Sequence, residues 1–331
     1  MQGERTLADI GEFGFIRRIA ALLGETDALL GIGDDAAVVD VGAGDYLLAT
    51  VDMLVEDVHF RRDRPGAFEV GRRAVAVNVS DIAAMGGEPR FALTSIALPP
   101  ALPLRWAEGL YRGIRHEADL LGVGVIGGNT ARTSGPLTLD VTLLGRVAKP
   151  DLVRRSGARV GDVLAVTGTL GGATAARLLQ ERPGGAASDL EESRRYSVPE
   201  PRVAAGRALA SLHLAHAMLD ISDGLASDVG HLAEASEVGA VIYEERLPIS
   251  SPTRRIAQHL SDSPRDLALF GGEDYELLVA LPEGAVEPAR RALGQLPLTV
   301  VGHVLPQEQG VVLERGGGTR EPLGAGGWRH F

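Results

Sequence analysis

Cysteine is absent from the 331 residues of this chain. Its absence excludes disulfide bridges, thiolate zinc sites and catalysis by a cysteine nucleophile. Lysine is nearly absent too, since Lys149 is the single lysine among 33 basic residues. No Gly-Lys-Ser/Thr sequence follows a predicted strand, so the chain has no P-loop and would have to bind a nucleotide in another way.

Long apolar runs are also missing, and no stretch is long enough to span a bilayer as a helix. The N-terminus has no signal-peptide pattern, so we expect a cytoplasmic protein. The formal net charge of −11 argues against nucleic-acid binding, which requires a basic surface. We therefore expect neither nucleic acid nor a membrane among the partners.

The chain is rich in hydrophobic residues, at 45%, and contains 43 glycines. This composition is typical of an α/β enzyme with many tight turns, and the length leaves room for two domains. Hydrophobic periodicity predicts helices and strands that alternate along the chain. The predicted helices are 13–23, 68–85, 104–121, 173–179, 203–212 and 225–235. The predicted strands are 36–41, 46–51, 91–98, 123–126, 137–147, 163–167, 217–221 and 277–281. The stretch 149–161 is interpreted as a domain joint, which gives domains at 1–149 and 150–331.

Five short acidic motifs are the most informative feature of the sequence. They are Gly31–Asp35, Thr50–Asp52, Asn78–Asp81, Asp220–Gly224 and Gly271–Glu276. One acidic motif beside a small residue is usually a turn or a helix cap. Five of them indicate a shared site, because Mg²⁺ takes oxygen ligands and bridges them to substrate phosphates.

Some of these motifs also have a purely structural interpretation. Gly31–Asp35 taken alone favours a turn before a strand. Ser222 or Asp223 would be an ordinary N-cap for the helix predicted at 225–235. Asp220, at the end of a predicted strand, is harder to explain in that way.

Other positions favour a functional role. Thr50–Asp52 is predicted at the C-terminal end of a strand, where α/β proteins place their chemistry. Asp81 lies in an apolar helical stretch, and a buried aspartate needs a partner such as a metal ion. His59 lies in a polar loop, where a phosphate or substrate contact competes with a structural role. Trp328, in a glycine-rich tail, either anchors the C-terminus or stacks on a flat ligand.

Together, four segments resemble the thiamine-monophosphate kinase family in order and spacing, and the match runs nearly end to end. The segments are Gly31–Ala36, Val75–Gly86, Asp220–Leu225 and Phe270–Leu277. The resemblance implies a two-domain α/β fold like that of aminoimidazole ribonucleotide synthetase, with the N-terminal domains of a homodimer pairing into a β-barrel. It assigns ATP and Mg²⁺ binding and dimerisation to 1–149, and completion of the nucleotide and substrate site to 150–331. It also implies that ATP and Mg²⁺ convert thiamine monophosphate to thiamine diphosphate by direct phosphoryl transfer.

The resemblance further implies roles for individual residues. Positions that match Mg²⁺ ligands are Asp35, Thr50, Asp52, Asp81, Asn129, Asp220 and Asp223, with Asp34 as a helper. Positions that match ATP contacts are Tyr111, Gly128, Asn129, Arg155 and Ser222. Positions that match substrate contacts are His59, Glu273 and Trp328. Arg155 and Asp223 are the predicted catalytic residues, and Arg155 is expected to stabilise charge on the transferred phosphoryl group.

Two positions depart from the family pattern. Asn129 stands where the family usually has aspartate, and Val51 replaces a common hydroxyl residue. These changes leave open a non-catalytic protein that binds a nucleotide or a thiamine phosphate. The other alternative is a different ATP-dependent enzyme of the same fold, such as a purine-type synthetase. Those purine enzymes lack the sequence of Gly271–Leu277 as it stands here.

Overall fold

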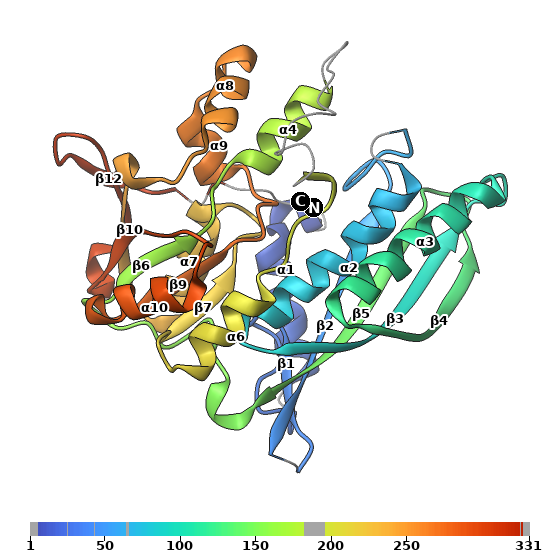
Figure 1. The fold of residues 1–331 in the computed structure, drawn as a ribbon, viewed down its shortest axis with the longest axis horizontal. Coiled ribbons are helices and arrows are strands. Elements are labelled where there is room, and N and C mark those ends of the chain that lie inside the picture. Colours follow the sequence, from blue (N-terminus) through green and yellow to red (C-terminus); the bar gives the residue numbers. More distant parts are fainter. Residues whose placement is uncertain are drawn as a thin grey trace, which may run out of the picture.

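The structure is a computed structural model that describes residues 6–24, 26–42, 44–63, 66–181, 196–324 and 326. Two mixed sheets, each with its own helices, lie side by side and give the molecule two lobes (Figure 1). We call the lobe with the five-stranded sheet the first lobe and the lobe with the seven-stranded sheet the second lobe.

The sheet of the first lobe has the strand order β1-β2-β5-β3-β4, and of its neighbouring strands only β3 and β4 run parallel. Its strands are β1 (Ala37–Asp40), β2 (Asp45–Val55), β3 (Glu88–Leu98), β4 (Gly124–Arg132) and β5 (Thr138–Ala148). Helices α2 (Ala67–Ala84) and α3 (Leu104–Leu121) cover one face of this sheet (Figure 1). Alternate residues of β5, such as Leu139, Val141 and Leu143, are buried beneath them. The opposite face carries exposed apolar side chains.

Helices α2 and α3 pack closely because glycine lies at their contact. A Cβ atom at Gly71 would lie 2.0 Å from the carbonyl oxygen of Leu110, and one at Gly113 would lie 1.9 Å from that of Phe68. Helix α2 also contacts α6 and β7 of the second lobe. It is therefore buried around most of its circumference and forms the junction between the lobes.

The sheet of the second lobe has the order β12-β11-β8-β10-β6-β9-β7. Its strands are β6 (Val163–Thr167), β7 (Ala217–Asp220), β8 (Gly239–Tyr243), β9 (Leu277–Leu281), β10 (Leu298–Leu305), β11 (Val311–Glu314) and β12 (Arg320–Pro322). Its helices are α4 (Gly172–Glu181), α6 (Val203–Ser211), α7 (Leu225–Ser236), α8 (Ser251–Leu260), α9 (Pro264–Phe270) and α10 (Val286–Leu293). All residues of β6, β9 and the edge strand β7 are buried, and α2 of the first lobe contacts β7.

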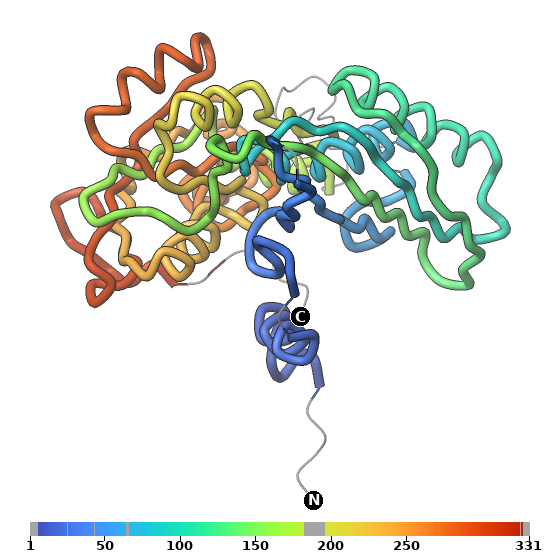
Figure 2. Tube along the Cα trace, turned by 90° about the horizontal axis from the view of Figure 1, so that it is seen from below, coloured from blue at the N-terminus to red at the C-terminus, as the bar shows by residue number. Residues whose placement is uncertain are grey.

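Helix α1 (Gly11–Leu23) stands away from both lobes, and none of its residues is buried (Figure 2). It contacts the second lobe through the rings of Phe13 and His231, whose centroids are 4.5 Å apart. Among the described residues, no helix combines the length and apolar content needed to cross a membrane.

The predicted elements agree with most of these bounds, but two strands are longer than expected. Strand β2 continues to Val55, so Thr50–Asp52 lies in mid-strand and its predicted place at a strand end is wrong. Strand β4 continues through Gly127–Asn129 to Arg132 instead of ending at 126. Backbone pairing of β2 with β5, and of β4 with β3, outweighs the local turn signals of acidic residues and glycines. The domain boundary at 149/150 stays a prediction.

Candidate active site

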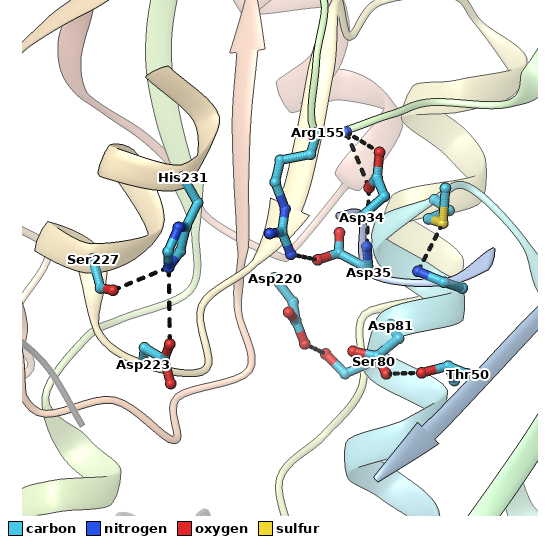
Figure 3. A network of polar contacts seen from close by, with 12 residues as sticks. Asp34, Asp35, Thr50, Ser80, Asp81, Arg155, Asp220, Asp223, Ser227 and His231 are labelled. Atoms are coloured by element: carbon cyan, nitrogen blue, oxygen red, sulfur yellow. Dashed lines mark hydrogen bonds and ion pairs between the residues drawn. The ribbon is translucent and has the colours of Figure 1, made fainter. Parts of the chain in front are cut away.

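Carboxylates from separate segments gather where α2 meets the end of β7 (Figure 3). The segments are the turn before β1, strand β2, helix α2, the end of β7 and the start of α7. We call this group the acidic cluster; its members are Asp34, Asp35, Asp52, Asp81, Asp220, Asp223 and Asp228.

The motif Asn78–Asp81 places two side chains of α2 against β2 and one against β7. The Asn78 side-chain oxygen accepts a hydrogen bond from the backbone N–H of Asp52 at 3.0 Å. The Ser80 hydroxyl donates to Asp220 of β7, which joins the two lobes. Asp81 accepts from the Thr50 hydroxyl at 2.5 Å (Figure 3). The motif therefore fixes the positions of β2 and β7, one strand from each lobe, at the acidic cluster.

Burial and mutual repulsion make the charged forms of these carboxylates costly. Burial raises the pKa of Asp220 to about 8, and repulsion from Asp35 and Asp52 adds to the shift. Burial also raises the pKa of Asp35 to about 6, although Arg155 opposes this change. The pKa of Asp81 is raised well above its ordinary value, again mainly by burial. Such a cluster favours a bound cation.

Arg155 partly neutralises the cluster. Its Nη2 lies 2.6 Å from Asp35 Oδ1, and its backbone N–H donates to the Asp34 carboxylate, 3.1 Å from Oδ2. The same Asp34 carboxylate accepts from the backbone N–H of Asp35 at 3.0 Å. In the part of the chain that the structure describes, the buried atoms Asp35 Oδ2 and Arg155 Nε have no hydrogen-bond partner. Asp35 Oδ2 is thus an open ligand position.

We expect the protein without divalent cations to lose stability as the pH rises from about 4 to about 8. Asp220 binds a proton more tightly in the folded state, because its pKa rises from 3.8 to about 8 on folding. The unfolded chain releases this proton first, so the free energy of unfolding falls across the window. Melting curves with a chelator at several pH values measure the slope, and added Mg²⁺ should flatten it. A melting temperature that rises with pH would contradict this assignment.

A cavity of about 510 Å³ lies between the loop after β2 and the loop before β9. We call it the His59–Glu273 pocket; it is lined in part by His59, Phe60, Arg177, Tyr196 and Glu273. His59 Nδ1 accepts a hydrogen bond from the backbone N–H of Val55 at 2.9 Å. Neutral His59 therefore carries its proton on Nε2. The two residues predicted as substrate contacts, His59 and Glu273, thus share one cavity.

The three acids of Gly271–Glu276 have three different partners. Glu273 lines the pocket and pairs with an arginine of α2. Asp274 accepts from the backbone N–H of Gly171 at 2.7 Å, just before α4. Glu276 is fully buried and accepts from Arg202 Nε at 2.7 Å. Glu273 is therefore the one acid of this motif that faces the pocket, and the other two hold the loop.

The loop of Glu273 connects the pocket to the acidic cluster. The backbone N–H of Glu273 donates to the carbonyl oxygen of Ser222 at 2.7 Å, and Ser222 lies between Asp220 and Asp223. Burial raises the pKa of Tyr275, and repulsion from Asp52 and Asp220 adds to the shift. The pocket and the acidic cluster are therefore adjacent and joined by a backbone hydrogen bond.

The structure corrects the N-cap interpretation of Ser222 and Asp223. The N-cap of α7 is Gly224, with a φ of 112°, and this residue has no side chain to cap the helix. Asp228 instead accepts a hydrogen bond from the backbone N–H of Gly224 at 3.1 Å. Side chains at 222 and 223 are thus placed by a glycine-dependent bend between β7 and α7.

Two residues of α7 that were not predicted as site residues, Asp228 and His231, lie beside Asp223. One ligand atom each from Asp223, Asp228 and His231 lies within 4.8 Å of the others. Burial lowers the pKa of His231 to about 4, so this histidine is neutral at pH 7. Asp228 and His231 are three residues apart, so their side chains lie on one face of the helix. This spacing is the sequence feature that could have identified them.

A second cavity, of about 760 Å³, lies beside Asp34, Asp35 and Arg155. Phe13 and Ile16 of α1 line it on one side, and His231 lines it as well. The acidic cluster therefore has a largely apolar cavity next to it in addition to the His59–Glu273 pocket.

The structure does not bring the predicted ATP contacts Tyr111, Gly128 and Asn129 to the cluster, and Asn129 is also a predicted Mg²⁺ ligand. Asp52 pairs with Val141, Val141 with Thr94, and Thr94 with Gly128. Because these are three strand spacings, Gly128 lies roughly 14 Å across the sheet from Asp52. Asn129 follows it on the exposed strand β4, and Tyr111 is exposed on α3. Trp328 lies outside the described residues.

Known proteins provide an independent comparison. Residues 33–147 match the N-terminal domain of AIR synthase related proteins, and residues 159–314 match their C-terminal domain. Thiamine-monophosphate kinase of Bacillus subtilis (strain 168) is 38% identical over 308 residues, which cover 91% of this chain and 93% of the relative.

Solved structures indicate the same family. AaThiL complexed with AMPPCP and TMP has a TM-score of 0.87 at 36% identity, with 99% of each chain covered. Thiamine-monophosphate kinase from Stenotrophomonas maltophilia K279a has a TM-score of 0.73 at 39% identity, covering 91% of this chain and 95% of that one. The predicted family and the two-domain α/β fold are confirmed. By motifs, architecture and sequence identity, this chain belongs to the thiamine-monophosphate kinase family.

Proposed function

We propose that this protein transfers the γ-phosphate of ATP to thiamine monophosphate and so produces thiamine diphosphate. The observation that carries this proposal is the connection of the acidic cluster to the His59–Glu273 pocket through the Glu273–Ser222 hydrogen bond. A cation-binding cluster suits phosphates, and the adjoining pocket suits a small organic substrate. The similar AaThiL was solved with AMPPCP and TMP bound. Because the proposed reaction consumes ATP, we propose that the protein acts in the cytoplasm.

The donor atoms of the acidic cluster fit Mg²⁺. The atoms are carboxylate and hydroxyl oxygens, and Asp35 Oδ2 is buried without a hydrogen-bond donor among the described residues. We propose as ligands Asp35, Thr50, Asp52, Asp81, Asp220 and Asp223. Asp34 accepts two backbone N–H groups and orients Asp35 and Arg155 as a helper. Bound Mg²⁺ neutralises the two phosphate-bearing substrates and lets them approach.

The side chains of the protein then mainly position the two substrates and stabilise the charge on the transferred phosphoryl group. The acceptor is a phosphate oxygen, which is already ionised near neutral pH, so the reaction needs no strong general base. Asp34 and Asp35 hold Arg155 at the edge of the cluster. We propose that Arg155 stabilises the negative charge on the transferred phosphoryl group. His59 and Glu273 hold the substrate in the pocket. Alignment of acceptor and donor supplies much of the rate.

A homodimer completes the proposed ATP site. Gly128, Asn129 and Tyr111 lie too far from the acidic cluster of their own chain, so we propose that they serve the cluster of a second copy. The open face of the first sheet is exposed and apolar, as an interface between copies requires. Its exposed apolar residues are Val51, Met53, Phe91 and Leu93.

We expect Leu93→Glu to separate the dimer and to abolish most of the activity. A carboxylate in the middle of this face would be buried without a partner in the dimer. Light scattering after gel filtration should give twice the 34.7 kDa chain mass for the parent protein and a single chain mass for the variant. Leu104→Glu is the matched control, because Leu104 is 74% exposed at the start of α3. A Leu93→Glu variant that stays dimeric would contradict the assigned interface.

Product analysis tests the function directly. Purified protein is incubated with ATP, Mg²⁺ and thiamine monophosphate, and thiamine diphosphate is quantified by chromatography, with free thiamine as the control substrate. We expect diphosphate from the monophosphate alone. ATP binding without diphosphate at high Mg²⁺ would indicate a non-catalytic binder.

A further inference from the structure

One buried arginine outside the acidic cluster connects three segments beside the His59–Glu273 pocket. Arg73 of α2 is 2% exposed. Its Nη2 donates to Glu273 Oε1, and its Nη1 donates to the carbonyl oxygen of Tyr196 at 2.9 Å. Its guanidinium carbon also lies 5.1 Å from the centroid of the Tyr196 ring. A single cation thus holds two residues that line the pocket.

The chemistry of Arg73 argues for more than packing. A guanidinium keeps its proton when buried, and removing it from water is costly unless it is well paired. Within the described chain, Arg73 Nε has no hydrogen-bond partner. An apolar side chain of similar volume would fill the same space without this cost. Arginine at this position differs from an apolar residue because it orients two acceptors, the Glu273 carboxylate and the Tyr196 carbonyl group.

Glu273 needs this support because its backbone is strained. Glu273 has a φ of +61° and Tyr275 a φ of +50°, both in the left-handed region that non-glycine residues rarely adopt. Backbone hydrogen bonds to Ser222 and Ile221 hold the main chain, at 2.7 Å and 2.9 Å. Arg73 holds the side chain, so the carboxylate is fixed from both ends.

We propose that Arg73 is a positioning residue that preforms the His59–Glu273 pocket for the thiamine part of thiamine monophosphate. This inference rests on the proposed function. Thiamine carries a cationic thiazolium ring and an aminopyrimidine, which suit an oriented carboxylate and an aromatic face. Arg73 bonds to Glu273 and Tyr196 and not to the acids of the cluster. Its loss should therefore weaken substrate recognition and leave the phosphoryl-transfer step nearly intact.

Steady-state kinetics of Arg73 variants test this role. We expect Arg73→Met and Arg73→Gln to raise KM for thiamine monophosphate about tenfold or more, since an oriented charged hydrogen bond is lost. Both kcat and KM for ATP should stay within about threefold of the parent. Arg73→Lys keeps the charge but loses the two-pronged geometry, so it should show a smaller rise of about threefold.

Arg202 offers a matched control. It forms a buried ion pair with Glu276 of the same loop, through Nε and Nη2 at 2.7 Å and 2.8 Å, but neither residue lines the pocket. Arg202→Lys should lower the melting temperature and leave KM for thiamine monophosphate unchanged. Glu273→Gln should raise KM about tenfold alone, yet add less than about threefold in the Arg73→Met background, because the two residues act as a unit.

Each outcome decides the proposal. A parental KM in Arg73→Met or Arg73→Gln, with a lowered melting temperature like that of Arg202→Lys, would reduce Arg73 to a structural residue. If neither of these variants folds, Arg73→Lys decides, because a parental KM there overturns the proposal. Parent protein that neither forms thiamine diphosphate nor binds thiamine monophosphate in calorimetry would overturn the proposed function, and this inference with it.

Discussion

Replacing Asp220 by asparagine is expected to lower kcat by roughly 10² to 10³-fold, because the proposed Mg²⁺ site loses one of its charged ligands. Asp220 is 4% exposed at the end of β7 and accepts from the Ser80 hydroxyl. Asparagine keeps the volume and one oxygen acceptor but removes the charge. Initial rates at saturating ATP and thiamine monophosphate, over a wide Mg²⁺ range, measure the effect.

The same change should stabilise the metal-free protein. Burial and repulsion from Asp35 and Asp52 raise the pKa of Asp220 to about 8, so its ionised form is unfavourable in the fold. Above that pH, Asp220→Asn should melt at a higher temperature than the parent in chelator. Asp119→Asn on α3 serves as the control, because that carboxylate belongs to an exposed ion pair. A kcat within threefold of the parent would remove Asp220 from the catalytic site.

Arg155→Met is expected to lower kcat by a similar factor, roughly 10² to 10³-fold, but to destabilise the protein. Arg155 is the cation that faces Asp35, and it opposes the rise in pKa of that carboxyl. Its loss leaves a buried carboxylate without its ion-pair partner. Arg155→Lys should recover part of kcat, because lysine keeps the charge without the planar fork.

Kinetics and melting curves together separate the two roles of Arg155. A variant that melts at a lower temperature but keeps the parental kcat would show that Arg155 only neutralises Asp35. We expect both quantities to fall, in contrast to Asp220→Asn, where kcat falls and the melting temperature rises. The opposite signs follow from opposite charges in one buried cluster.

Local patterns in the sequence predicted much of the fold. Helix Leu104–Leu121 and strands Val163–Thr167 and Leu277–Leu281 have the predicted bounds, because periodicity and flanking breakers agree there. The extension of β2 to Val55 could not be predicted, since it depends on pairing with β5, which is distant in sequence. Local turn signals are outweighed by such long-range pairing.

The site was predictable where a motif and its chemistry coincide. Asp81 was selected because a buried aspartate needs a partner, and Asp220 because it ends a predicted strand; the structure places both in the acidic cluster. Arg73 was not selected, because its partner Glu273 is 200 residues away in sequence. The separation of Asn129 from the cluster was equally hidden, because it depends on the strand order β2-β5-β3-β4.

The most direct test of this account follows the γ-phosphate itself. ATP labelled with ¹⁸O in its γ-phosphate is incubated with the protein, Mg²⁺ and thiamine monophosphate, and the products are analysed by mass spectrometry. The account predicts that the label appears in the terminal phosphate of thiamine diphosphate, in proportion to the ADP formed. Label found in inorganic phosphate, with thiamine monophosphate unchanged, would contradict it.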